Sequence, residues 1–370
     1  MTPREWAVVG VVLAAVAASW IATAVARRVA HARGMLDPVE ARRIHTVPTP
    51  RFGGAGVLVG LLVGAFIGWW ADSRPGSDAG WPFLAFDPLD PRLVGCLSFF
   101  GLGALDDLPK RGRGLSAAAK LALQAAAAAM LALAMGLRFQ GAVAGPVRAA
   151  GWPDLAFADG SAFWTVAWIV AVVNLLNFLD GIDSILATTA IVVLSAGAAW
   201  TFGASSPLAL AGVGALLGFA AWNASPARIF LGDGGSHLVA FLVASLPCAL
   251  AAPGGGAPAS GGVPWPLVAA PLLPAVVDVA EALLHKARHG IPMSQAHHDH
   301  LYQRLAKAGW SHGAVALRYG ALSLIGVVLA GPVAHRLGAL AAGGIGAVVM
   351  AVHLGAAART TRGVARLAKS

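Results

Sequence analysis

Long apolar stretches follow one another along the whole chain, separated by short segments that hold most of the polar and charged residues. Each stretch approaches the roughly 20 residues that a helix needs to cross a bilayer. The eleven stretches fall at about residues 6–26, 53–71, 92–105, 115–135, 163–179, 184–203, 207–222, 236–251, 264–284, 314–333 and 337–357. This pattern predicts an all-α polytopic membrane protein of about ten or eleven transmembrane helices, with the first stretch retained as a helix and not removed as a signal peptide.

Composition and charge predict how this protein is oriented in the membrane. Hydrophobic residues make up 58% of the chain and charged residues 12%, against roughly 25% charged in an ordinary soluble domain. If the N-terminus lies outside and each stretch crosses once, most Lys and Arg residues fall in the inner segments, as membrane topology favours. We therefore expect a periplasmic N-terminus, cytoplasmic basic loops and a single membrane domain over residues 1–370.

Charge and cysteine content argue against nucleic-acid binding and against sites built from cysteine. The net charge of +9 follows from the basic inner loops, which face anionic lipid headgroups, so it does not indicate a nucleic-acid partner. Cys96 and Cys248 both lie in apolar stretches. Neither a disulfide framework nor a cysteine metal site is indicated.

Two acidic segments lie at the predicted inner ends of apolar stretches. Asp106 and Asp107 follow the third stretch directly. Asn177, Asp180 and Asp183 repeat every three residues and would cover an arc of about 120° if the helix continues. Ionisable groups at membrane depth usually face a cavity or a partner, although a solvated helix end and a capping turn are the plainer alternatives.

A glycine-rich segment, NASPARIFLGDGGS at 223–236, lies between two predicted helices on the inner side. Its glycines would let the backbone around Asp233 approach an anion closely. We expect Ser236 to open the next helix, whose N-terminal dipole favours phosphate. A glycine turn with an incidental aspartate is the alternative.

A histidine segment and a basic segment complete the inner loops. His297, His298 and His300 fall within HHDHLYQR at 297–304, which also holds Arg304. This segment suits zinc or phosphate equally, unless it is a surface amphipathic helix. Arg51 belongs to a basic Pro/Gly segment at 42–54, which fits an anionic substrate or a plain inner loop.

The predicted topology places all five segments on the same side of the membrane. Together they supply acids, amides and glycines surrounded by Arg and His side chains. Mg²⁺ takes oxygen ligands and is typically bound by one or two carboxylates together with substrate phosphates. The five segments therefore predict a site for Mg²⁺ and a pyrophosphate group.

The ordered set of motifs resembles the polyprenyl-phosphate N-acetylhexosamine-1-phosphate transferases, the superfamily that includes phospho-MurNAc-pentapeptide translocase. The resemblance covers about residues 35–310 and rests on PTPRFGG at 48–54, DDLPK at 106–110, NLLNFLDGID at 174–183, and the glycine and histidine segments. It implies that a UDP-sugar of the N-acetylhexosamine type donates its sugar 1-phosphate to a polyprenyl phosphate such as undecaprenyl phosphate, releasing UMP. It also implies a bacterial cytoplasmic membrane, a lipid-linked surface glycan as product and, as an option, a homodimer.

The resemblance assigns roles to individual residues. The catalytic group is Asp106, Asp107, Asp180 and His297, of which the paired acids engage or deprotonate the lipid phosphate. The substrate-binding group is Arg51, Asn177, Asp183, Asn223, Phe230, His298, His300 and Arg304, with Asp183 on the nucleoside side and Asn223 and Phe230 lining the uridine pocket. The metal ligands are Asp233 and Asp106, for Mg²⁺ or alternatively Mn²⁺.

The sequence departs from the translocase branch at the histidine segment, where HHDH is followed by Tyr302-Gln303-Arg304. This pattern is more similar to the branch that initiates O-antigen and other surface polysaccharides. Direct attack of the lipid phosphate and a covalent aspartyl-phosphate route both remain open. The rival functions are a transporter or flippase for an anionic lipid or a metal ion, and a zinc-dependent intramembrane hydrolase.

Overall fold

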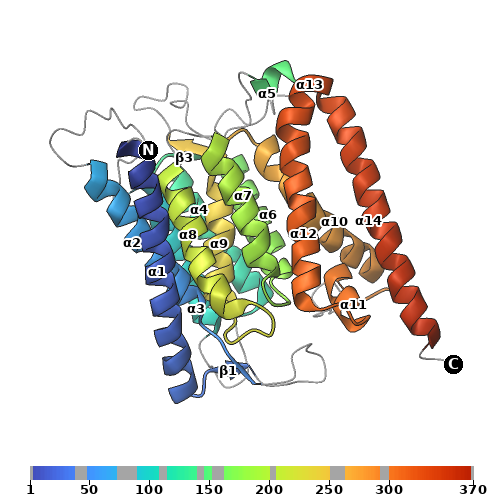
Figure 1. The fold of residues 1–370 in the computed structure, drawn as a ribbon, viewed down its shortest axis with the longest axis horizontal. Helices are drawn as coiled ribbons and strands as arrows, with labels where there is room; N and C mark the ends of the chain where they lie inside the picture. Colours follow the sequence, from blue (N-terminus) through green and yellow to red (C-terminus); the bar gives the residue numbers. More distant parts are fainter. Residues whose placement is uncertain are drawn as a thin grey trace.

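The computed structural model describes residues 3–37, 48–72, 90–107, 115–139, 146–151, 162–200, 206–250, 263–291 and 300–367. Within these residues each of the eleven predicted stretches overlaps a main helix (Figure 1). These helices are α1 (Pro3–Ala32), α2 (Gly54–Asp72), α3 (Pro91–Asp107), α4 (Ala117–Leu133), α6 (Ala162–Leu179), α7 (Ile185–Trp200), α8 (Ser206–Asn223), α9 (Gly232–Ser245), α10 (Pro266–Arg288), α12 (His312–Val328) and α14 (Ala339–Leu367). The all-α fold is thereby confirmed.

Short elements join the main helices. They are α5 (Pro146–Ala149), α11 (Leu301–Lys307), the π-helical turn η2 (Leu329–Val333) and α13 (Ala334–Leu337), with two antiparallel strand pairs, β1 (Leu36–Asp37) with β2 (Thr49–Pro50) and β3 (Leu137–Phe139) with β4 (Cys248–Leu250). Six helices in the described part of the chain are long and apolar enough to cross a membrane: α1, α2, α6, α10, α12 continued through α13, and α14. The chain is therefore a multi-pass membrane protein, and the count of ten or eleven crossings stays a prediction.

Small residues let the first helices pack closely. A Cβ atom added at Gly56 of α2 would lie 2.0 Å from Oγ1 of Thr23 on α1. The hydroxyl of Ser19 donates a hydrogen bond of 2.6 Å to the carbonyl of Ala215 on α8. Close backbone approach with side-chain hydrogen bonds between helices is how membrane helices associate, because lipid provides no hydrophobic force between them.

Helix α9 lies at the centre of the bundle, packed against α3, α6 and α2. Its side chains from Gly234 to Ser245 are all buried. The Phe241 ring stacks on Phe99 of α3, with ring centroids 4.8 Å apart. The sequence predicts a helix over 236–251, and this boundary is wrong at both ends, because α9 begins at Gly232 and ends at Ser245, before the strand β4.

The predicted site segments gather at one end of the bundle. The ends of α3 and α6, the starts of α4 and α9, and the short helix α11 lie at the end opposite to the chain's N-terminus (Figure 1). The start of α1 and the end of α14 lie at opposite ends of the bundle (Figure 1), as an odd number of crossings requires. Helices α12 and α14 stand at the edge farthest from α1 and carry exposed apolar side chains such as Leu317 and Leu340.

Candidate active site

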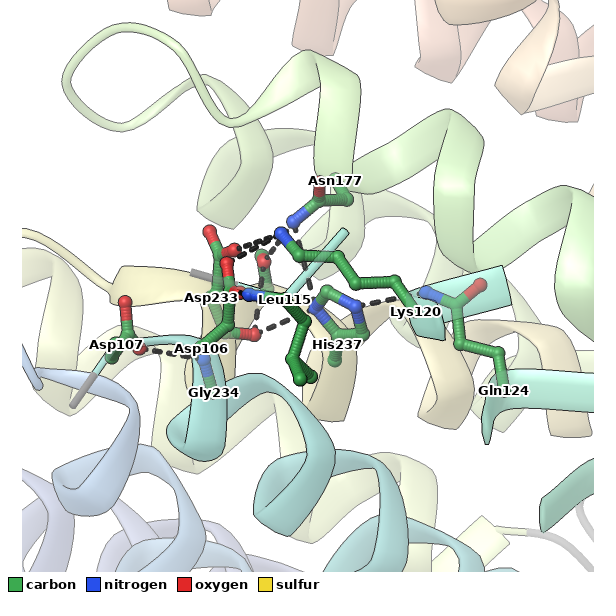
Figure 2. A network of polar contacts seen from close by, with 10 residues as sticks. Asp106, Asp107, Leu115, Lys120, Gln124, Asn177, Asp233, Gly234 and His237 are labelled. Carbon is green, nitrogen blue, oxygen red and sulfur yellow. Dashed lines mark hydrogen bonds and ion pairs between the residues drawn. The ribbon is translucent and has the colours of Figure 1, made fainter. Parts of the chain in front are cut away.

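Carboxylates from two helices meet around the ammonium group of Lys120 on α4 (Figure 2). The Nζ atom of Lys120 lies 2.5 Å from Oδ2 of Asp106, near the end of α3, and 3.0 Å from Oδ2 of Asp233, in the first turn of α9. Beside this pair, Oδ2 of Asp107 accepts a hydrogen bond of 2.8 Å from the backbone N–H of Gly234. The structure thus brings together three of the acids that the sequence singles out.

Glycines allow α3 and α9 to approach this closely. A Cβ atom at Gly103 would lie 2.1 Å from the carbonyl oxygen of Asp233. Gly232 has a φ of +78°, a conformation that residues with a Cβ rarely adopt, and its own Cβ would lie 2.7 Å from Oδ2 of Asp107. The sequence places Asp233 in a loop before the helix, whereas the structure places it inside the helix, because Gly232 and not Ser236 opens α9.

The charge balance of the cluster favours protonation of its less well paired acids. Burial, reinforced by the charge of Asp233, raises the pKa of Asp107 to about 6. Burial, followed by the charges of Asp233 and Asp107, raises the pKa of Asp180 to about 8. For Asp106 burial acts in the same direction, but its bonds to Asp233, Lys120 and the N–H of Leu115 outweigh it and hold its pKa below the ordinary value.

The side chains of Asn174, Gln124 and His237 form a chain of hydrogen bonds that ends at the backbone of Asp233. The side-chain amide of Asn174 donates to Oε1 of Gln124 at 2.7 Å, and Nε2 of Gln124 lies 2.9 Å from Nε2 of His237. The other ring nitrogen, Nδ1 of His237, lies 2.7 Å from the carbonyl oxygen of Asp233. Since a carbonyl only accepts, the His237 proton lies on Nδ1 and the amide of Gln124 donates to Nε2. These contacts fix the turn of α9 that carries Asp233.

Lys120, Gln124 and His237 are residues of the candidate site that sequence reasoning missed. All three line a cavity beside Asp106, together with Leu102, Leu115 and Leu123. A signal was present, because Lys120 and Gln124 stand four residues apart in an otherwise apolar stretch. That spacing places both on one face of a helix, and an ionisable group inside such a helix is rarely there for packing alone.

The acidic segment after α6 differs from its prediction. The sequence predicts that the helix carries Asn177, Asp180 and Asp183 on one face, but α6 ends at Leu179 and a turn follows. Asn177 remains on the helix and donates a hydrogen bond of 2.7 Å to the hydroxyl of Ser236 on α9. The carboxylate of Asp180 has no hydrogen-bond partner among the described residues, and its pKa responds to the charges of the cluster.

Asp183 and Asn223 lie together in a buried loop contact. Oδ2 of Asp183 accepts from the N–H of Ala227 at 3.2 Å and lies 3.0 Å from Nδ1 of His312. Asn223 accepts from the N–H of Ser184 at 2.8 Å and donates to the carbonyl of Ile229 at 2.9 Å. Both residues are 6% exposed, so in this conformation they hold the two loops against each other.

Arg51 and Phe230 belong to two segments that lie beside this centre. Arg51 forms an ion pair with Asp37 across the strands β1 and β2, and its charge lowers the pKa of Asp107. The backbone N–H of Phe230 donates to the carbonyl of Pro50 at 2.8 Å, which joins the glycine segment to the basic segment. His297 and His298 lie outside the described residues.

The described part of the histidine segment is held by α10. Nδ1 of His300 lies 2.7 Å from Oδ2 of Asp278, and Nη2 of Arg304 lies 2.9 Å from Oε1 of Glu281. Tyr302, between them, donates its phenolic hydrogen to the carbonyl of Phe178 at 2.9 Å. This bond joins the histidine segment to the acidic turn after α6.

The fold and the site define a class of protein, a polytopic membrane protein with a cluster of carboxylates at one end of its helix bundle. The model of glycosyl transferase family 4 matches residues 92–251. Over 373 aligned positions the chain is 30% identical to the decaprenyl-phosphate N-acetylglucosaminephosphotransferase of Mycobacterium tuberculosis (strain CDC 1551 / Oshkosh), covering 94% of this chain and 89% of that protein. The chain therefore belongs to the polyprenyl-phosphate sugar-1-phosphate transferases of glycosyl transferase family 4.

Two further relatives place the chain within that family. It is 26% identical to the probable undecaprenyl-phosphate N-acetylglucosaminyl 1-phosphate transferase of Bacillus subtilis (strain 168), over 79% of this chain and 75% of that protein. It is 30% identical to the phospho-N-acetylmuramoyl-pentapeptide-transferase of Rhodococcus opacus (strain B4), over 54% of this chain and 62% of that protein. The resemblance drawn from the motifs is confirmed, and the chain is a transferase.

Proposed function

We propose that the chain transfers N-acetylhexosamine 1-phosphate from a UDP-sugar to polyprenyl phosphate, with release of UMP. The observation that carries this proposal is the meeting of Asp106 and Asp233 at Lys120, with Asp107 beside them and Asp180 within range of their charge. The names of the decaprenyl- and undecaprenyl-phosphate relatives support N-acetylglucosamine as the sugar and a polyprenyl phosphate as the acceptor. The reaction would start a lipid-linked surface glycan at the cytoplasmic face of a bacterial inner membrane.

In the proposed reaction an oxygen of the lipid phosphate attacks the β-phosphorus of the UDP-sugar. A new phosphorus–oxygen bond forms, the bond from the β-phosphorus to the bridging oxygen breaks, and UMP leaves with that oxygen. Asp107 is the base whose pKa suits this step, because its pKa of about 6 matches the second pKa of a phosphate monoester, which is about 6. It would accept the remaining proton of the lipid phosphate and so increase the negative charge on the attacking oxygen.

The carboxylates fit a divalent cation by their chemistry. Mg²⁺ prefers oxygen ligands and is usually bound by one or two carboxylates plus substrate phosphates. Within the described ranges no three His, Cys, Asp or Glu side chains are grouped closely enough to hold a metal ion, so the phosphates would complete its shell. We assign Asp233 and Asp106 to Mg²⁺, or to Mn²⁺ in its place. When bound, the cation neutralises the charge that develops on the leaving phosphate.

The remaining assignments concern the substrates. Arg51, Asn177, His298, His300 and Arg304 would bind the sugar nucleotide and its phosphates, and His297 would act beside the acids. Asp183, Asn223 and Phe230 would line the uridine side. Since Asp183 and Asn223 are occupied by contacts with Ala227, His312, Ser184 and Ile229, this part of the proposal requires those loops to open for the nucleotide.

The experiment that tests the function follows the β-phosphate. Purified protein in lipid nanodiscs receives UDP-N-acetylglucosamine labelled with ³²P at the β-position, together with undecaprenyl phosphate and Mg²⁺. The proposal expects label in the lipid fraction, and none when EDTA replaces Mg²⁺ or when the lipid phosphate is omitted. Other UDP-N-acetylhexosamines in the same assay identify the preferred sugar, and a complete lack of labelled lipid with every donor would refute the proposal.

A further inference from the structure

A second buried carboxylate, Asp278 on α10, lies outside the acid cluster and receives three hydrogen-bond donors. Its side chain is 1% exposed. Oδ1 accepts from the backbone N–H of Tyr302 at 3.1 Å and from the hydroxyl of Tyr319 on α12 at 2.7 Å. Oδ2 lies 2.7 Å from Nδ1 of His300. Three separate segments of the chain therefore meet at this carboxylate.

These contacts fix both the proton and the orientation of the His300 ring. An ionised carboxylate only accepts hydrogen bonds, so the proton of a neutral His300 ring lies on Nδ1. The lone pair of Nε2, on the opposite side of the ring, is then left as an acceptor. The ring also stacks on Tyr302 and Phe178, with centroids 5.5 and 6.3 Å away, which limits its rotation.

The same arrangement joins His300 to the acidic turn. The Oη atom of Tyr302 donates to the carbonyl of Phe178 at 2.9 Å. A Cβ atom added at Gly181 would lie 2.0 Å from this Oη atom. Helix α11 therefore packs directly against the turn that contains Asp180. Asp278 thus holds the described part of the histidine segment, from His300 onward, in place beside a residue of the proposed active site.

We propose that Asp278 is a positioning residue that holds the proton of His300 on Nδ1, so that Nε2 accepts a hydrogen bond from a hydroxyl or amide N–H group of the sugar nucleotide. This inference rests on the proposed function for the identity of that substrate. Asp278 itself touches no substrate and acts only through His300. The arrangement corresponds to the aspartate that fixes a histidine tautomer in hydrolytic triads.

The decisive variant is Asp278→Asn, which keeps the size of the side chain and reverses one of its contacts. The backbone N–H of Tyr302 can only donate and therefore requires an acceptor at Oδ1, so the new NH₂ group faces His300. Nδ1 must then accept, and the proton of the neutral ring moves to Nε2, where it blocks the acceptor. We expect the KM for the UDP-sugar to rise about 10- to 100-fold, with kcat and the KM for polyprenyl phosphate unchanged.

Two further variants separate positioning from a merely structural role. Tyr319→Phe removes a different donor to Asp278 and leaves the His300 contact intact, so its KM for the UDP-sugar should equal that of the wild type. In a His300→Ala background, Asp278→Asn should add no further rise in KM, because the group it acts through is gone. An unchanged KM in Asp278→Asn, or the same added rise in the His300→Ala background, would overturn the proposal.

A spectroscopic measurement tests the inference independently of activity. Nitrogen NMR of ¹⁵N-histidine-labelled wild-type protein, with the His300 signal assigned by its loss in His300→Gln, should show a ring protonated at Nδ1 and bare at Nε2. A ring protonated at Nε2, or at both nitrogens, would overturn the proposal. Since this spectrum needs no turnover, it decides the inference even if the wild-type protein releases no UMP, an outcome that would refute the proposed function alone.

Discussion

Replacing Lys120 with methionine should destabilise the protein by an amount that follows from its two ion pairs. At the separations of 2.5 and 3.0 Å, each pair has a Coulomb energy of about 6 kcal/mol at an effective dielectric constant of about 20. Desolvation and solvent screening offset most of this, because the Lys120 side chain is 29% exposed. Breaking such a partly buried pair leaves a net loss of about 2–3 kcal/mol.

This loss converts into a measurable shift of the thermal midpoint. With an unfolding entropy of about 2.1 cal/mol/K per residue over 370 residues, the midpoint of Lys120→Met should fall by about 3–4 °C in differential scanning fluorimetry without divalent cations. Saturating Mg²⁺ should raise the midpoint of Lys120→Met more than that of the wild type, because the variant's carboxylates lack their cation. The charge-conserving variant Lys120→Arg should keep most of the wild-type midpoint.

If Lys120→Met melts at or above the wild-type midpoint, the ion pairs contribute no net stability. If Mg²⁺ shifts the two proteins equally, Lys120 does not neutralise the carboxylates that bind the cation.

Three other perturbations test separate parts of the site. Gly103→Ala should lower kcat about 100-fold, because its Cβ would lie 2.1 Å from the carbonyl oxygen of Asp233 and displace α9 from α3, whereas Gly101→Ala, with nothing within 4 Å, should match the wild type; equal kinetics of the two variants would contradict this. The pKa of Asp180 is raised from 3.8 to about 8, so the native state binds more protons than the unfolded state, and the free energy of unfolding should fall as the pH rises from about 4 to 8. Asp180→Asn should flatten this dependence of the thermal midpoint, and an unaltered slope would argue against it. If the lipid phosphate attacks directly, radiolabelled UMP should not exchange into the UDP-sugar until polyprenyl phosphate is added, whereas exchange without lipid would indicate the covalent aspartyl-phosphate route.

Hydropathy was enough to predict the helices but not where they end. The three-residue spacing of Asn177, Asp180 and Asp183 mimics a helical face, yet α6 ends at Leu179. The helix is interrupted by contacts from distant segments, because Tyr302 packs under Gly181 and Asn223 accepts from the N–H of Ser184. Such contacts are set by tertiary packing and leave no local periodic signal.

The acidic members of the site were predictable and their partners were not. An aspartate beside an apolar helix is costly enough to stand out in a sequence, which is why Asp106, Asp107 and Asp233 could be singled out. Lys120 is just as costly, but it lies 14 residues after Asp106, and only the packing of α4 beside α3 brings the two together. His237 follows Asp233 by one helical turn, a relation that becomes visible only once α9 is known to begin at Gly232.

The central claim is that this cluster of acids transfers a sugar phosphate to a lipid phosphate. The most direct measurement is UMP release by the purified protein from UDP-N-acetylglucosamine, with and without undecaprenyl phosphate, for the wild type and for Asp233→Asn. The account predicts UMP release that requires both the lipid and Mg²⁺ and is lost in Asp233→Asn while the variant keeps the wild-type fold. UMP release that continues without the lipid, or that survives in Asp233→Asn, would contradict it.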